Sequence, residues 1–259
     1  MSRLRAKCPH CRTLTAVALG TDYECHSCGR EFRAGLVRVP RAWGKGGEEM
    51  VAAARLHLPY PEAAVVEEHT LAEQNLALAV ALPERPLVLG GCCCAHVGAV
   101  EGLAARHGRI AVVWLDAHGD LNTPETSPSG NEWGMPLRML IDAQTVDAAD
   151  VLLVGARNLD PPEAEFIAAS GLRTAEAGLA AALEGTSGVY VALDVDVLDP
   201  AEPLVMFMPE PGGPSVAEIA AFVERVAAAA PLVGAGFTGL RAAPQNAAAL
   251  ERFAAALGL

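Results

Sequence analysis

Apolar residues follow two alternating patterns along this chain. Short unbroken apolar runs, such as IAVVWL at residues 110–115, are separated by longer segments in which apolar residues recur at helical spacing. The short runs are typical of strands buried on both faces, and the longer segments of amphipathic helices. Strands are therefore predicted at residues 87–89, 110–115, 151–156, 171–174, 189–193 and 232–238, and helices at residues 48–58, 61–82, 97–106, 162–170, 174–183, 216–230 and 246–257. This alternation predicts an α/β protein, a three-layer α/β/α sandwich with a mainly parallel sheet.

Two of the predicted strands, 110–115 and 189–193, end in clustered ligand-type side chains. These are Asp116, His118 and Asp120 after the first strand, and Asp194 and Asp196 after the second. Alternate side chains of an extended chain point the same way, and parallel sheets bind ligands at the carboxyl ends of their strands, so these groups are expected to converge. Their negative charges would repel one another unless cations lay between them, and the oxygen-rich set suits Mn(II). Asp199, which precedes Pro200, is interpreted as a turn former.

A second group of metal-type residues opens the chain. It consists of two CxxC pairs separated by thirteen residues, namely Cys8, Cys11, Cys25 and Cys28. Each pair closes a tight turn whose two thiolates can face one cation, so the spacing predicts one structural zinc in a zinc ribbon of residues 1–35. A segment this short cannot bury enough core to fold without the metal. Residues 36–47 are interpreted as a linker to one large α/β domain, residues 48–259.

Composition and charge narrow the class of protein. The chain is 52% hydrophobic with a mean hydropathy of +0.27, which excludes disorder, and its formal charge is −12. Residues 1–41 alone carry eight basic and three acidic residues. Four zinc-bound thiolates would reduce this excess of positive charge. We therefore predict that the ribbon docks on the acidic body, and that nucleic-acid binding is disfavoured. No apolar run is long enough to cross a bilayer and no leader is recognisable, which predicts a cytoplasmic protein with no membrane contact.

The motifs around the ligand-type residues resemble those of a known family. DAHGDLN, SGN-x-x-GMP, DVDVLDP and PEPGG are similar to motifs of the arginase, agmatinase and formiminoglutamase (ureohydrolase) family, and the match runs from about residue 86 to residue 244. The resemblance implies that a hydroxide held between two manganese ions cleaves a linear C–N bond of an amidino or guanidino compound. It also implies a homo-oligomer, a trimer or a hexamer.

The resemblance assigns the metal ligands and the catalytic groups. It implies that Asp116 and Asp194 bridge the two metals, that Asp120 completes one site, and that His118 with Asp196 completes the other. Asp120 and His118 would thus take part in catalysis. Cys93 stands where the family usually has a histidine ligand. A thiolate there would favour Zn, Fe or Co at that one metal, whereas the alternative is a buried cysteine that binds nothing.

Two further departures concern catalysis and the substrate. Trp133 stands where the family has a proton-shuttling histidine, so either Glu132 or His96 takes over that role or the shuttle is lost. Trp133 itself is expected to form a wall or lid of the pocket. Arg241 falls at the position of the guanidinium-binding glutamate, which favours a neutral or anionic substrate over arginine or agmatine. The alternative is that Arg241 points to solvent.

Other polar residues match substrate-holding positions of the family. They are Asn122, Ser129, Asn131 and Asp160. Local turn bonding is the alternative role for such residues in loops. Three functional hypotheses remain open at this point: a hydrolase of an amidine or guanidine other than arginine, a catalytically degenerate scaffold that keeps the metal site, and a zinc-ribbon protein that binds nucleic acid.

Overall fold

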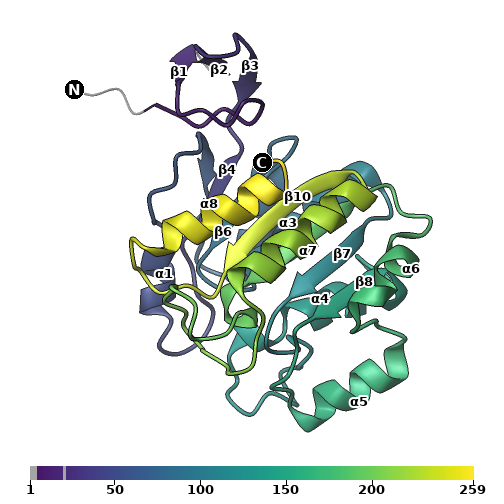
Figure 1. Ribbon diagram of the computed structural model, residues 1–259. Coiled ribbons are helices and arrows are strands. Elements are labelled where there is room, and N and C mark those ends of the chain that lie inside the picture. The colour runs from purple at the N-terminus through teal and green to yellow at the C-terminus, as the bar shows by residue number, and fades with distance from the viewer. Residues whose placement is uncertain (1–4, 20–21) are drawn as a thin grey trace.

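The computed structural model describes residues 5–19 and 22–259, which form a small β module and a larger α/β body (Figure 1). The sheet of the body pairs its neighbouring strands in parallel throughout. In spatial order its strands are β5 (Glu62–Val65), β4 (Leu36–Val39), β6 (Leu87–Gly90), β10 (Leu232–Thr238), β9 (Val189–Asp194), β7 (Ala111–Leu115) and β8 (Val151–Val154). The carboxyl ends of β6, β10, β9 and β7 therefore lie side by side.

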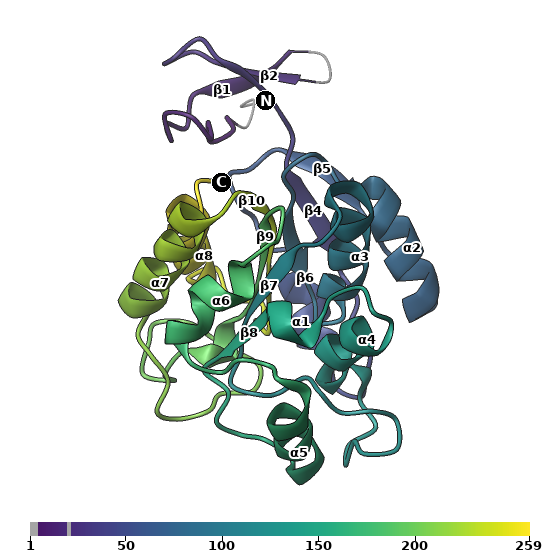
Figure 2. The same ribbon diagram turned by 90° about the vertical axis from the view of Figure 1, so that its right-hand side faces the viewer.

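Helices cover both faces of this sheet, so the predicted three-layer architecture is confirmed (Figure 2). One layer contains α2 (Leu71–Ala81), α3 (Ala95–His107) and α4 (Pro136–Asp142), and the other contains α6 (Leu179–Leu183), α7 (Val216–Ala229) and α8 (Asn246–Ala256). The remaining helices are α1 (Glu48–Ala53) and α5 (Pro161–Ser170), with short 3-10 turns at Glu132–Gly134, Ala148–Asp150, Glu176–Gly178 and Val195–Val197. No helix in the described part of the chain has the length and apolar character needed to span a membrane.

The unbroken apolar strands are explained by two cores, one on each face of the sheet. Along β7, Val113 and Leu115 pack into the core beneath α7 and α8, whereas Val112 and Trp114 pack into the core beneath α2 and α3. Successive side chains of a strand alternate between faces, so a strand covered on both sides must be apolar at every position.

Two predicted segments differ from the structure at the edge of the sheet. Residues 36–47 do not form a simple linker, because their first four residues are the buried strand β4, and Arg38 donates to the carbonyl oxygens of Ala54 and Leu56. Residues 61–82 do not form one helix, because β5 precedes α2. Pairing of β5 with β4 outweighs the helical preference of its alanines, since tertiary context overrides propensity. The proposed division at residue 35 stays a prediction.

Smaller differences concern element ends. The helix predicted over residues 48–58 stops at Ala53, and the predicted strand 171–174 is reduced to a single bridge between Arg173 and Leu152. The helix predicted over residues 174–183 is a 3-10 turn followed by α6.

The small module is an antiparallel sheet of β1 (Ala16–Leu19), β2 (Asp22–Cys25) and β3 (Glu31–Arg33). It contacts the body of its own chain through Lys7, whose backbone N donates to the Pro59 carbonyl oxygen at 2.6 Å and whose Nζ lies 3.0 Å from Glu251 Oε2. A basic residue of the module thus meets an acidic residue of the body, in agreement with the predicted docking.

Candidate metal centres

The ligand-type residues of the body meet at the carboxyl edge of the sheet. Ligand atoms of Cys93, Asp116 and Asp120 lie within 4.8 Å of one another, and so do those of Asp116, His118 and Asp196. The two groups share Asp116, and Asp194 joins them because Cys93 Sγ lies 3.0 Å from Asp194 Oδ2. We call these six side chains the ligand cluster. They come from the ends of β6, β7 and β9, the arrangement in which open parallel sheets bind ligands.

Asp120 reaches the cluster by a route that the sequence pattern did not predict. An extended chain was expected to turn alternate side chains to one side, but β7 ends at Leu115 and Asp120 has a left-handed backbone with φ of 53°. A non-glycine residue in this conformation is uncommon and is often held at a functional site. The convergence of Asp116, His118 and Asp120 is therefore present, but a bend produces it.

Backbone groups hold the two central carboxylates in place. Asp116 Oδ1 accepts from the backbone N of His118 at 2.7 Å, and Asp194 Oδ1 accepts from the backbone N of Asp196 at 2.9 Å. Each carboxylate thereby organises the turn that follows its own strand, which is the usual role of aspartate in such turns. The second oxygen of each carboxylate faces the cluster.

Burial makes the metal-free cluster a proton-holding site. It raises the pKa of Asp194 and of Asp196 to about 7 and that of Asp120 well above its ordinary value, with neighbouring carboxylates adding to the effect. Burial alone would lower the pKa of His118, but its contacts with Asp116 and Asp196 raise it to about 12. Divalent cations would displace these protons and balance the negative charges.

The donor set of the cluster fits divalent cations. Asp120 Oδ2 is buried and has no hydrogen-bond partner among the described residues, so a cation would satisfy an otherwise isolated oxygen. His118 Nδ1 lies between Asp116 Oδ1 at 3.3 Å and Asp196 Oδ2 at 3.1 Å, which aims it into the second group. Carboxylates with one imidazole suit Mn(II), whereas the thiol of Cys93 adds a softer ligand on one side only.

Glu210 was not identified from the sequence, although it lies within the recognised PEPGG motif. Its Oε1 lies 3.6 Å from His118 Nε2, on the side of the ring that faces away from the cluster, and accepts from Asn158 Nδ2 at 2.7 Å. At this distance Glu210 is a neighbouring charge of the His118 ring and not a hydrogen-bond partner. The position of Glu210 is visible only after the loop of residues 201–214 folds against His118.

The predicted substrate-side residues divide into two groups. Asn122 Nδ2 donates to Asp160 Oδ2 at 2.8 Å, so these two positions form a polar pair beside the cluster. Ser129 Oγ accepts from the backbone N of Asn131 at 3.2 Å, which is the local turn bonding considered as its alternative role. Asn131 Oδ1 accepts from the backbone N of Lys45 at 2.9 Å, and so ties this loop to the segment before α1. Both loops lie at the mouth of the site.

Apolar side chains cover the ligand cluster. A cavity of about 20 Å³ beside Cys93, Asp194 and Asp196 is partly open to solvent and is lined by Met50, Trp133, Phe207 and Met208, which we call the apolar lid. Trp133 and Phe207 meet edge to face at 5.9 Å. The Trp133 ring lies against Gly44, where an added Cβ would come within 2.4 Å of it. Trp133 is thus a lid residue, as expected.

Arg241 lies at the rim of this lid and not inside the cavity. Its Nη1 is 2.7 Å from Glu49 Oε2, and its guanidinium lies 5.6 Å from the centre of the Phe207 ring. The Arg241 side chain is 44% exposed, so it neither lies fully within the substrate pocket nor points entirely to solvent. The Arg241 guanidinium is partly exposed to solvent but lies beside the entrance to the cavity.

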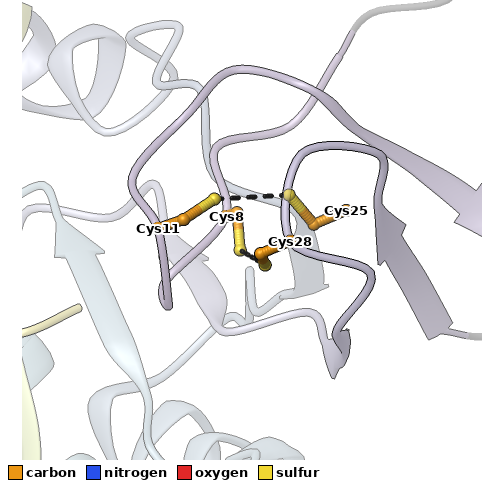
Figure 3. A group of neighbouring side chains, drawn as sticks. All are labelled: Cys8, Cys11, Cys25 and Cys28. Carbon is orange, nitrogen blue, oxygen red and sulfur yellow. Dashed lines mark hydrogen bonds between the residues drawn. The ribbon is translucent and has the colours of Figure 1, made fainter.

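The four cysteines of the β module also converge, as Figure 3 shows. Cys8 Sγ lies 3.7 Å from Cys28 Sγ, and Cys11 Sγ lies 3.4 Å from Cys25 Sγ. Tetrahedral zinc with Zn–S bonds of about 2.3 Å requires sulfur atoms separated by about 3.8 Å. The sulfur positions therefore fit one zinc ion.

Replacing Gly239 by Ala tests how tightly the cluster is supported. Gly239 has φ of +74°, and a Cβ there would lie 1.8 Å from Asp194 Oδ1. We expect Gly239→Ala to lower the free energy of unfolding by about 1–2 kcal/mol through backbone strain and by a further 1–3 kcal/mol, roughly, through the collision. Denaturant unfolding of the metal-free chain measures both. Gly171→Ala, at a left-handed φ of +78° with open space around it, isolates the strain; equal losses in the two variants would contradict the collision.

The fold and the ligand cluster define an α/β protein with a candidate binuclear metal centre at the carboxyl edge of a parallel sheet. The chain belongs to the arginase family, whose sequence model matches residues 48–257. It is 37% identical over 142 residues to an arginase of Staphylococcus aureus, a match that covers 45% of this chain and 47% of that protein, or about half the length of the relative. It is 34% identical over 199 residues to the arginase of Bacillus caldovelox, covering 64% and 67% of the two chains.

A solved structure extends this similarity. The native structure of the Bacillus caldovelox arginase at pH 5.6 superimposes with a TM-score of 0.73 and 27% identity, covering 86% of this chain and 96% of that one. The similarity in structure therefore covers nearly all of that arginase, while the similarity in sequence is concentrated in a shorter stretch.

Proposed function

We propose that this protein is a metal-dependent hydrolase that cleaves a linear C–N bond of a small amidino or guanidino compound other than arginine. The observation that carries the proposal is the pair of ligand groups that share Asp116 at the carboxyl edge of the sheet. Membership of the arginase family supports the same reaction class. Bound divalent cations would supply Lewis-acid activation of water and of the substrate carbon.

Each ligand residue has a proposed place in this centre. Cys93 and Asp120 would hold one cation, His118 and Asp196 the other, and Asp116 and Asp194 both. Manganese is proposed for the oxygen-rich side, and Zn, Fe or Co are compatible with the thiolate side. In the reaction, Asp120 and His118 are proposed to act as ligands, Asp120 through its otherwise unpaired Oδ2, and Glu210 lies on the far side of the His118 ring.

Protonation of the leaving amine requires a different residue from the usual histidine. Trp133 has no proton to give at neutral pH. His96 is fully buried and bonded to Tyr190 and Thr238, so it is committed elsewhere. Glu132 is exposed and directly precedes Trp133 in the chain, and we propose it as the residue that takes over proton transfer.

The apolar lid and Arg241 support a restricted substrate. A cavity of about 20 Å³ has room for little more than one water molecule. An extended amino acid such as arginine would have to displace Trp133 or Phe207, and its guanidinium would approach Arg241. We therefore propose short amidines or guanidines that are neutral or anionic, held at their polar end by Asn122 and Asp160.

The test is a substrate panel graded by length and charge. Manganese-loaded protein is assayed for ammonia and urea release from guanidinoacetate, 3-guanidinopropionate, 4-guanidinobutyrate, agmatine and arginine. The first three carry a carboxylate that balances the guanidinium charge, and we expect release from the shortest of these and none from arginine. Trp133→Ala should admit the longer members because it removes the lid ring. Trp43→Ala is the matched control, since it also removes an indole from the same apolar cluster but does not line the cavity.

A second candidate function is a metal-binding or assembly scaffold without catalysis. It is favoured by the same small cavity, in which Trp133 and Phe207 leave little room beside the cluster. Two metals bound in the body, with no product from any member of the panel in either the wild type or Trp133→Ala, would contradict the hydrolase and support the scaffold. Arginine cleaved faster than the short compounds would contradict the proposed substrate class.

A further inference from the structure

Three fully buried side chains form a hydrogen-bonded line behind Asp194. Tyr190 Oη lies 3.0 Å from His96 Nδ1, and His96 Nε2 lies 3.2 Å from Thr238 Oγ1. Thr238 Oγ1 in turn lies 3.1 Å from Asp194 Oδ2. Tyr190, His96 and Thr238 are each 0% exposed. The line thus connects the interior of the body to a carboxylate that faces both ligand groups.

The fold makes room for this line. Gly236 of β10 faces the His96 and Tyr190 side chains, and a Cβ there would lie 2.5 Å from Tyr190 Oη and 2.8 Å from His96 Nδ1. The His96 ring also meets the edge of Trp114 at 5.1 Å. A larger residue at position 236 would therefore push the imidazole away from Thr238.

The hydrogens along the line can be assigned from its end. The Thr238 hydroxyl donates its single hydrogen to Asp194 Oδ2. The Thr238 oxygen then accepts from His96, which places the imidazole hydrogen on Nε2 and leaves Nδ1 to accept from the Tyr190 hydroxyl. Burial lowers the pKa of His96 to about 3, which agrees with a ring that carries only one hydrogen. Every donor in the line therefore points toward Asp194.

We propose that Tyr190, His96 and Thr238 are positioning residues that hold Asp194 in the orientation required of a ligand of the metal centre. The inference rests on the proposed function, because it needs cations in the ligand cluster. Cys93 is included in the same contact, since its Sγ lies 3.3 Å from Thr238 Oγ1 and 3.0 Å from Asp194 Oδ2. Groups behind metal ligands commonly set their orientation and affinity.

Cobalt(II) binding to the full-length, metal-free chain tests the proposal. Thr238→Val removes the hydroxyl without changing the shape of the side chain, and we expect about a 10- to 100-fold weaker affinity in the body. Tyr190→Phe should weaken it in the same direction by a smaller factor. Thr238→Ser restores the hydroxyl and should restore the affinity. The visible absorption of the body cobalt should change in Thr238→Val, while that of the cobalt held by the four module cysteines should not.

Tyr60→Phe is the matched control. The Tyr60 hydroxyl is also buried but has no hydrogen-bond partner among the described residues, so its removal should leave the affinity unchanged. Thermal unfolding of the metal-free variants identifies any that fail to fold. If Thr238→Val is one of them, the cobalt affinity of the isosteric Tyr190→Phe variant decides whether the positioning role holds. Wild-type affinity in Thr238→Val and Tyr190→Phe, with the body loaded, would overturn the positioning role alone. Cobalt bound only by the module cysteines of the wild type would overturn the metal centre and the positioning role together.

Discussion

Asp194→Asn is expected to empty the metal centre that we propose for the body while leaving in place the zinc that we propose for the small module. Asp194 Oδ2 lies 3.0 Å from Cys93 Sγ, which follows β6, and accepts from Thr238 Oγ1, at the end of β10, at 3.1 Å. The Asp194 side chain therefore contacts groups from both of these strand ends. An amide is a weaker ligand than a carboxylate, and its NH₂ group would turn a donor toward the cations. The loss of affinity should exceed the roughly 10- to 100-fold effect of residues behind ligands.

Elemental analysis of metal per chain, after dialysis in metal-free buffer, measures this result. Asp199→Asn is the control, because Asp199 instead accepts from the backbone N of Ala201 and of Gly212 and organises the following loop. Its expected role as a turn former is thus confirmed. Full metal content in the Asp194→Asn variant would show that the ligand assignment is wrong.

The stability of the metal-free variant separates ligand loss from unfolding. Burial raises the pKa of Asp194 to about 7, above the value of about 4 in an unfolded chain. A raised pKa means that the fold favours the protonated group, so the metal-free wild type should lose stability as the pH rises from about 4 to about 7. Asparagine carries no charge, and the variant should therefore lose less stability over that range. Denaturant unfolding at pH 5 and pH 8 checks this difference.

Cys25→Ser is expected to release the module zinc and to unfold the residues around it. Cys25 is buried between Cys11 Sγ at 3.4 Å and Thr15 Oγ1 at 3.3 Å. The hydrogen bond from Thr15 is the main reason that the pKa of Cys25 is lowered to about 5, so the thiolate is present at neutral pH. The core of the module consists of little more than its cysteines and Ala6, Ala16, Tyr23 and Phe32, so metal binding supplies much of its stability.

Zinc content and limited proteolysis of the full chain measure this effect. We expect loss of one zinc per chain and cleavage within residues 5–35, while the body stays resistant. His26→Ala is the control, since His26 is exposed in the same knuckle and is not among the four clustered ligands. A zinc-free module that still resists cleavage would contradict a structural role for the metal.

Local sequence patterns were sufficient for the central strands of the sheet and for the aspartates and the histidine of the cluster. Runs such as residues 110–115 are apolar at every position because both faces of β7 are buried, and a polar residue can first appear where the strand ends. Asp116 and Asp194 are therefore placed by pattern alone. The spacing of Cys8, Cys11, Cys25 and Cys28 is equally local, because each pair closes one turn.

Tertiary structure decided the features that depend on contacts between distant segments. β4 and β5 are strands because β4 pairs with β6 and the edge strand β5 pairs with β4, although their sequences indicated a linker and a helix. Asp120 enters the cluster through a left-handed turn, and Glu210 reaches His118 only through the fold of a loop. The line from Tyr190 to Asp194 and the lid of Trp133 over a cavity of about 20 Å³ likewise join segments far apart in the chain. The sequence by itself determined which side chains can bind metal, because the ligand chemistry of a side chain depends on its residue type alone. Packing decided which groups orient those ligands and how substrate reaches them, because both depend on contacts between segments that are distant in the chain.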